Sequence, residues 1–282
     1  MTDEQSIWMY DPSLPLAVIA TVIYGIIFLV LAYQTLIKYR AWFFIVVVVG
    51  SAIEVAAYNL RIYSIQNQSE ITPFVMTLTY TVLAPVLIAA GNYLLISRLI
   101  FAVLPQSHHR ILKIPGRHLT PVFVGCDVIA FLIQGSGSGV ASSDNWQGEM
   151  ERIGVKILIS GLSFQLVAFS LFICVFRRFH ILAGRMAIDS APKGWQKVVL
   201  SVYISSILIM IRCIFRVVEF AGGRNSYAFN HEWLFWVFES LPMVGAIGIF
   251  CIYHPYRYLG ESDGRRKGVQ AEDSVELAER RK

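Results

Sequence analysis

The sequence predicts an all-α protein, a bundle of seven transmembrane helices with the amino terminus outside the cell and the carboxyl terminus in the cytosol. Three observations lead to this prediction. Of the 282 residues, 56% are hydrophobic and only 15% are charged, whereas a soluble domain carries about 25% charge. Seven apolar stretches approach the length of a bilayer, and basic residues gather in alternate connections. These observations predict an integral membrane protein.

Each apolar stretch is close to the roughly 20 residues that cross about 30 Å of hydrocarbon. The stretches cover residues 16–36, 42–63, 74–95, 119–133, 155–176, 198–220 and 233–253. The fourth is short, and the Gly-Ser-Gly-Ser-Gly sequence at residues 135–139 predicts a flexible outer loop after it. Pro85 and Pro242 predict kinks in the third and seventh spans. The first span is expected to be retained, because residues 1–5 lack the basic start of a secretory signal.

The orientation is predicted from the basic residues. Most of the 24 lysines and arginines follow spans one, three and five or lie in the carboxyl tail, and cytosolic loops are the ones that carry such an excess. Three parts result: an extracellular segment at residues 1–15, a seven-helix membrane domain at residues 16–255, and a disordered cytosolic tail at residues 256–282. One glycosylation sequon, at Asn67, lies in a loop that this topology places outside, and its use is left open.

Several classes of function are disfavoured by the sequence. No Gly-Lys dipeptide occurs, so no P-loop is present to drive a nucleotide-powered pump. The six histidines lie near span ends or in loops, which argues against an intramembrane metal site and against an enzyme. The four cysteines all fall within spans, so no disulfide framework is expected. We expect no cofactor and no nucleic acid; the expected partners are membrane lipids and an amphipathic small molecule.

The sixth span contains Arg212, Arg216 and Glu219. Their spacing of four and three residues places all three on one face of a helix. An ionisable group at the centre of a bilayer costs about 2.5–3.5 kcal/mol on insertion scales, so these side chains must face protein or water. This pattern indicates a polar site inside the bundle.

Other spans carry ionisable or amide side chains at similar depths, which predicts an outward-facing polar pocket. Its expected substrate-binding residues are Glu54, Arg61, Asp127, Gln134, Gln165, Arg212, Arg216, Glu219 and Glu239. The arginines suit an anionic or zwitterionic head group, and the carboxylates suit an amine or a transported proton. Alternatively, these charges only neutralise one another and hold the helices together. His231-Glu232, at the entrance to the seventh span, is either a gate or an interfacial anchor.

The chain resembles the fungal RTA-like family, also described as lipid-translocating exporters, over nearly all of residues 10–255. The motifs that carry the resemblance are Tyr10-Asp11-Pro12-Ser13, Trp42-Phe43-Phe44, Gly50 with Glu54, Tyr58 and Arg61, Leu83-Ala84-Pro85, Asp127 with Phe131 and Gln134, Gly161-Leu162 with Gln165, Arg212, Phe215-Arg216 and Glu219, His231-Glu232, Pro242-Met243 and His254-Pro255. Glu239 stands where the family pattern has Asp.

The resemblance implies a multi-pass protein, often of the plasma membrane, linked to movement of sphingoid long-chain bases and other lipids and to resistance to toxic compounds. A porphyrin-related role is also described in the family. We therefore predict an ATP-independent transporter or exporter of an amphipathic lipid, either a sphingoid base or a phospholipid, or of a related toxic compound. The alternative is a seven-helix receptor or stress sensor for a lipid-like ligand.

Overall fold

The structure is a computed structural model that describes residues 12–68, 70–104, 110–111, 114–143, 148–185, 194–223, 227 and 231–259. Within these residues the fold is helical, apart from a short antiparallel pair formed by β1 (Arg110–Ile111) and β2 (Ile114–Pro115). Across the described ranges, seven helical segments are long and apolar enough to be candidate membrane spans, which agrees with the number predicted from the sequence.

In the described residues the spans are built from eleven helical elements, some of them short turns at which the hydrogen-bond register changes. In chain order these are α1 (Leu14–Ala32), η1 (Tyr33–Lys38), η2 (Trp42–Phe44), α2 (Ile45–Gln66), α3 (Ile71–Val103), α4 (Gly116–Ser142), α5 (Gly148–Arg185), α6 (Trp195–Ala221), α8 (Glu232–Phe235), η4 (Trp236–Ser240) and α9 (Leu241–Ile252). The first span joins α1 to η1, the second joins η2 to α2, and the seventh joins α8, η4 and α9.

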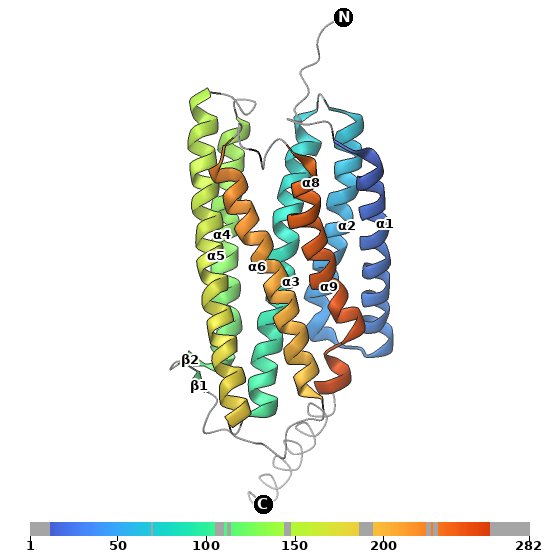
Figure 1. The fold of residues 1–282 in the computed structure, drawn as a ribbon, viewed down its shortest axis with the longest axis vertical. Coiled ribbons are helices and arrows are strands. Elements are labelled where there is room, and N and C mark those ends of the chain that lie inside the picture. Colours follow the sequence, from blue (N-terminus) through green and yellow to red (C-terminus); the bar gives the residue numbers. More distant parts are fainter. Residues whose placement is uncertain are drawn as a thin grey trace, which may run out of the picture.

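Neighbouring spans run in opposite directions, so the bundle has two distinct ends (Figure 1). The end at which α1 begins is at the top of the figure and is called the upper end below; the β1–β2 pair lies at the lower end. Helix α3 passes through the middle of the bundle and is the most buried span, whereas α1 is the least buried. Much of the apolar surface of α1 therefore faces the surroundings, as expected for a helix at the edge of a membrane bundle.

Helices α4 and α5 pack closely because glycines lie where they meet. A Cβ atom at Gly137 would lie 2.6 Å from the backbone nitrogen of Leu158, and one at Gly154 would lie 2.5 Å from that of Ala141. No side chain fits at such distances, so glycine is required at both positions. Close approach through small residues is a common way for membrane helices to associate. The two helices thus form one tightly joined pair.

The end of α4 differs from the structure predicted from the sequence. Residues 135–139 were expected to form a flexible outer loop, but they continue α4 as far as Ser142. Gly137 supplies the close contact with α5, and the Ser136 hydroxyl donates a hydrogen bond to the Ile133 carbonyl of its own helix at 2.8 Å. In hydrocarbon a helix satisfies its own backbone groups, and this overrides the low helix propensity of Gly and Ser.

Aromatic side chains fill the lower half of the bundle. Phe172, Phe176 and Phe179 follow one face of α5, with ring centroids 6.2 and 6.1 Å apart. Tyr93 of α3 meets the ring of Phe172 edge-on at 4.6 Å. Nearer the lower end, His254 accepts or donates a hydrogen bond with Thr35 at 3.1 Å and stacks on Tyr39. These contacts join α3 to α5 and the first span to the seventh.

Several predictions fall on residues outside the described ranges. Residues 1–11 make up most of the predicted extracellular segment, and residues 260–282 make up most of the predicted tail. Ser69 of the sequon is also outside them, while Asn67 directly follows α2 as its C-cap and its side chain donates a hydrogen bond to the Tyr63 carbonyl at 3.1 Å. The orientation of the bundle and its division into three parts remain predictions.

Candidate functional site

Five of the sequence-predicted residues form one ion-paired group in the upper half of the bundle, here called the ionic cluster. It consists of Arg212, Arg216 and Glu219 from α6, Glu54 from α2 and Glu239 from η4. All five are buried, with exposed fractions from 1% to 9%. Their position agrees with the helical spacing, which places the three residues of α6 on its buried face.

Arg212 connects α6 to three other spans. Its Nη1 atom lies 3.6 Å from Oε1 of Glu54, and its Nη2 atom donates to Oε1 of Glu239 at 3.2 Å. The same Nη2 atom donates to the backbone carbonyl of Thr81 in α3. The guanidinium, which has five donors, thus links four spans.

Arg216 holds the other side of the cluster. Its Nη1 atom donates to Oε2 of Glu219 at 3.0 Å, one turn further along α6. Its Nη2 atom donates to Oε1 of Glu239, the same oxygen that Arg212 contacts. Glu239 therefore accepts from both arginines and is the central residue of the cluster.

Glu239 reaches this position from an irregular part of the backbone. It lies in the π-helical segment η4, three residues before Pro242 in the first turn of α9. Proline cannot donate a backbone hydrogen bond, and a π-helical turn shifts side chains relative to a regular helix. Such turns are frequent at functional sites. The proline of the seventh span therefore coincides with the site, although it was predicted only to bend the helix.

The cluster leaves several buried polar atoms without a hydrogen-bond partner among the described residues. They are Nε of Arg216, Nη1 of Arg212, Oε1 of Glu54 and Oε2 of Glu239. Arg212 Nη1 and Glu54 Oε1 attract each other at 3.6 Å, beyond hydrogen-bond distance. An unsatisfied buried polar atom costs about 1–3 kcal/mol, and more when charged. The cluster thus has unused capacity for a further polar group.

The remaining predicted residues lie outside the cluster. Arg61 pairs with Glu232 at 3.1 Å at the upper end, with its guanidinium 4.2 Å from the centroid of the Phe235 ring. Both carboxylate oxygens of Glu232 also accept from the backbone nitrogen of Ser13, at 3.1 and 2.9 Å. Glu232 fastens the start of α1 to α8 and α2. It was not among the predicted site residues, although its place after His231 had drawn attention to it.

Asp127, Gln134 and Gln165 form two separate hydrogen-bonded pairs. The Tyr93 hydroxyl donates to Oδ2 of Asp127 at 2.8 Å, between α3 and α4. The amide of Gln134 donates to Oε1 of Gln165 at 2.9 Å, between α4 and α5. The prediction of one continuous pocket lined by all nine residues therefore differs from the arrangement found, in which five ionic residues gather and four contact neighbours elsewhere.

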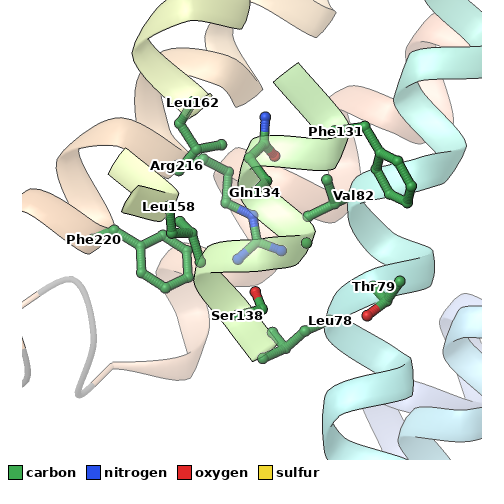
Figure 2. Close-up of a pocket in the computed structure, with 11 residues that line it drawn as sticks. Leu78, Thr79, Val82, Phe131, Gln134, Ser138, Leu158, Leu162, Arg216 and Phe220 are labelled. Carbon is green, nitrogen blue, oxygen red and sulfur yellow. The ribbon is translucent and has the colours of Figure 1, made fainter. Parts of the chain in front are cut away.

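A narrow crevice borders the ionic cluster. It lies between α3, α4, α5 and α6, and Arg216 and Gln134 are among its lining residues (Figure 2). Most of the other lining side chains are apolar, including Leu78, Phe131 and Phe220. Its free volume is about 30 Å³, and one water needs about 10–15 Å³, so the crevice holds only two or three water-sized groups.

In the part of the chain that the structure describes, no group of three His, Cys, Asp or Glu side chains is placed to hold a metal ion. The four cysteines are free thiols. The residues that converge most closely are therefore those of the ionic cluster, which can bind charged or hydrogen-bonding groups.

Comparison with known proteins identifies relatives over most of the chain. Protein RTM1 of Saccharomyces cerevisiae is 32% identical over 74% of this chain and 66% of its own length. Protoporphyrin uptake protein 1 of Saccharomyces cerevisiae is 31% identical over 72% of this chain and 65% of its own length. The sphingoid long-chain base transporter RSB1 of Saccharomyces cerevisiae is 23% identical over 89% of this chain and 74% of its own length.

The chain thus spans about two thirds of the length of the first two relatives. None of the three is named as an enzyme, and no solved structure matches the chain. A family model described as RTA1 like protein matches residues 47–262, which include every residue of the ionic cluster. The chain is therefore a multi-pass membrane protein that belongs to the RTA1-like protein family.

Proposed function

We propose that this protein is an ATP-independent carrier that moves an amphipathic lipid across the membrane and binds the head group at the ionic cluster. The upper end faces the cell exterior in this proposal, and the plasma membrane is its location. The excess of basic residues in the loops of the lower end supports that orientation.

The observation that carries the proposal is the charge of the ionic cluster. Three carboxylates, Glu54, Glu219 and Glu239, surround two guanidiniums. With every group ionised, one negative charge remains without a counterpart in the cluster. A bound ammonium group would neutralise it, and burial strengthens that attraction because the local dielectric is low. This favours an amphiphile with an amine head group, such as a sphingoid long-chain base, and the name of the relative RSB1 agrees with this choice.

Glu219 is the residue we assign to the amine. It is the most exposed carboxylate of the cluster and contacts one arginine, whereas Glu239 contacts both. An entering ammonium would compete with Arg216 for Glu219. Arg216 keeps its bond to Glu239 during this exchange, so the guanidinium stays paired while the head group is bound. Head-group binding then requires no buried charge to be left alone.

The proposal is tested with purified protein in liposomes, by measuring transbilayer movement of a labelled long-chain amine and of a labelled phospholipid. We expect protein-dependent movement of the amine. Arg216→Ala and Glu219→Gln should reduce it to the level of empty liposomes while the variants still insert into membranes. Glu149→Gln, which changes an exposed carboxylate in the first turn of α5, is the matched control. Equal rates with and without wild-type protein for both probes would contradict the proposal.

The same experiment separates the carrier from the receptor that the sequence also suggested. A receptor would bind the labelled amine with loss of binding in Glu219→Gln, yet would move no lipid across the bilayer. Saturable binding of the amine without its movement across the bilayer would therefore contradict the carrier and favour the receptor.

A further inference from the structure

The crevice beside the ionic cluster opens on the side of the bundle. Gly135 of α4 lines the crevice and is itself exposed, and Thr79 and Leu78 of α3 line the opposite wall. A Cβ atom at Gly135 would meet nothing within 4 Å. The exposed apolar side chains Val128 and Leu132 precede Gly135 on the same side of α4. Because α4 is a candidate membrane span, we expect the crevice to open toward the hydrocarbon of the membrane.

From this geometry we infer a lateral portal between α3 and α4, centred on Gly135, through which a membrane amphiphile enters, and the crevice widens to take one alkyl chain. The inference rests on the proposed function and adds the route and the part of the ligand that the crevice takes. The occupant is a single-chain amphiphile whose polar end reaches Arg216.

The chemistry of the walls matches such an occupant. Leu158 and Phe220 add to the apolar walls formed by α3 and α4, which suit a hydrocarbon chain. The guanidinium of Arg216 extends toward Ser138 across the crevice in Figure 2. Arg216 is only 4% exposed, and its Nε atom has no hydrogen-bond partner among the described residues. An oxygen near the amine of the amphiphile, such as a hydroxyl, would accept this hydrogen bond.

Hydrogen bonds hold α3 and α4 together below the portal. Tyr93 donates to Asp127 at 2.8 Å, Thr120 donates to the Tyr93 carbonyl at 2.9 Å, and the hydroxyls of Ser97 and Thr120 lie 2.7 Å apart. Gly135 lies eight residues beyond Asp127, or about 12 Å further up the helix. The described bonds thus fasten the lower part of the α3–α4 contact, while the part beside Gly135 is lined mainly by apolar groups.

The way in which the portal widens follows from the neighbouring contacts. Helices α4 and α5 are joined through Gly137 and Gly154 and through the Gln134–Gln165 hydrogen bond. They therefore move as a pair. Separation of this pair from α3 at the upper end, with the Tyr93–Asp127 bond as the fixed point, enlarges the crevice without breaking the described contacts between α4 and α5. Asp127 acts in this scheme as a positioning residue.

Gly135→Trp tests the portal, with Gly125→Trp as the matched control. Both glycines are in α4 and both have open space at Cβ, but Gly125 does not line the crevice. We expect Gly135→Trp to reduce movement of the labelled long-chain amine to the background of empty liposomes, and Gly125→Trp to keep the wild-type rate. Equal rates in the two variants would overturn the portal while leaving the carrier in place.

A binding measurement tests the portal independently of transport. The probe is a single-chain amine with a photoreactive diazirine in the middle of its alkyl chain, added to wild-type protein in liposomes. We expect adducts on the crevice-lining parts of α3 and α4, residues 78–82 and 131–138, and their loss in Gly135→Trp. Adducts confined to other helices would overturn the inference, even if wild-type protein moved no lipid.

Discussion

The upper and lower halves of this bundle are held together by different kinds of contact. In the lower half, aromatic rings of α5 stack on one another and one of them meets Tyr93 of α3 edge-on, with centroid distances of 4.6–6.2 Å. In the upper half, Arg212 and Arg216 join α6 to α2 and η4 through buried carboxylates. One half is packed through apolar surface and the other through paired charges.

This difference supports the proposal that the upper half binds the ligand. Aromatic contacts stabilise a membrane bundle through dispersion and leave no polar group unsatisfied. Buried ion pairs are a weak source of stability, because replacing them with apolar side chains is often neutral or stabilising. This weak contribution to stability supports the proposed ligand-binding role of the ionic cluster over a role in helix association alone. Substitutions in the two halves should separate stability from transport.

The largest loss of stability is expected for Arg212→Ala. This change leaves Glu54 without the cation beside it and removes one of the two donors to Glu239. Breaking a buried ion pair costs about 3–5 kcal/mol. Thermal unfolding in detergent micelles should show a marked decrease in midpoint, with Ile211→Ala, at a partly exposed neighbouring position, as control. An unchanged midpoint would mean that the cluster contributes nothing to the fold.

Phe172→Ala should destabilise the lower half without affecting the site. Phe172 is fully buried and contacts Tyr93, Phe123 and Phe176. Truncation of a buried Phe costs about 3 kcal/mol or more. The same unfolding assay should report this loss, while lipid movement per folded molecule at a lower temperature stays at the wild-type level. Loss of movement in the folded fraction would contradict the separation of the two halves.

Gly154→Leu tests the close packing of α4 on α5. The new side chain would meet the backbone of Ala141 and of Gly137, where even a Cβ atom has no room. Overpacking of this kind costs about 1–3 kcal/mol. The unfolding midpoint should fall less than for Arg212→Ala. Gly184→Leu, also in α5 but with open space at its Cβ position, is the control and should unfold as the wild type does.

The smallest effect is expected for Glu232→Gln. The Arg61–Glu232 pair lies at the upper end, and the Glu232 side chain is 14% exposed. Ion pairs near solvent contribute about 0–1 kcal/mol. The unfolding midpoint should therefore change little, and added salt should reduce the difference from wild type further. A loss as large as that of Arg212→Ala would place Glu232 within the structural core of the site.

The sequence predicts the architecture better than the site. Seven apolar stretches gave the number of spans, because a helix in hydrocarbon must be long and apolar. The spacing of Arg212, Arg216 and Glu219 correctly placed them on one buried face of α6. The fourth span was predicted too short, since the glycines at 135 and 137 weaken its hydropathy and helix propensity while serving the crevice and the packing on α5.

The sequence does not predict which polar residues gather in the ionic cluster and which pair with neighbours elsewhere. Depth along a helix is set by residue number, but the partner of each side chain depends on how the helices are rotated and which of them are neighbours. Asp127 and Glu54 are both acids within predicted spans, yet one meets the hydroxyl of Tyr93 and the other meets Arg212. The π-helical turn that directs Glu239 toward the arginines likewise has no simple signature in its sequence.

Oε1 of Glu239 accepts hydrogen bonds from both arginines, so a change at one arginine affects the other. A head group that binds Glu219 leaves Arg216 with Glu239 as its remaining carboxylate partner, so Arg216 draws more strongly on this atom and Arg212 shifts toward Glu54. Occupancy near α6 would in this way be transmitted to α2 and, through the carbonyl of Thr81, to α3. A single shared acceptor thereby makes three spans respond together to one event.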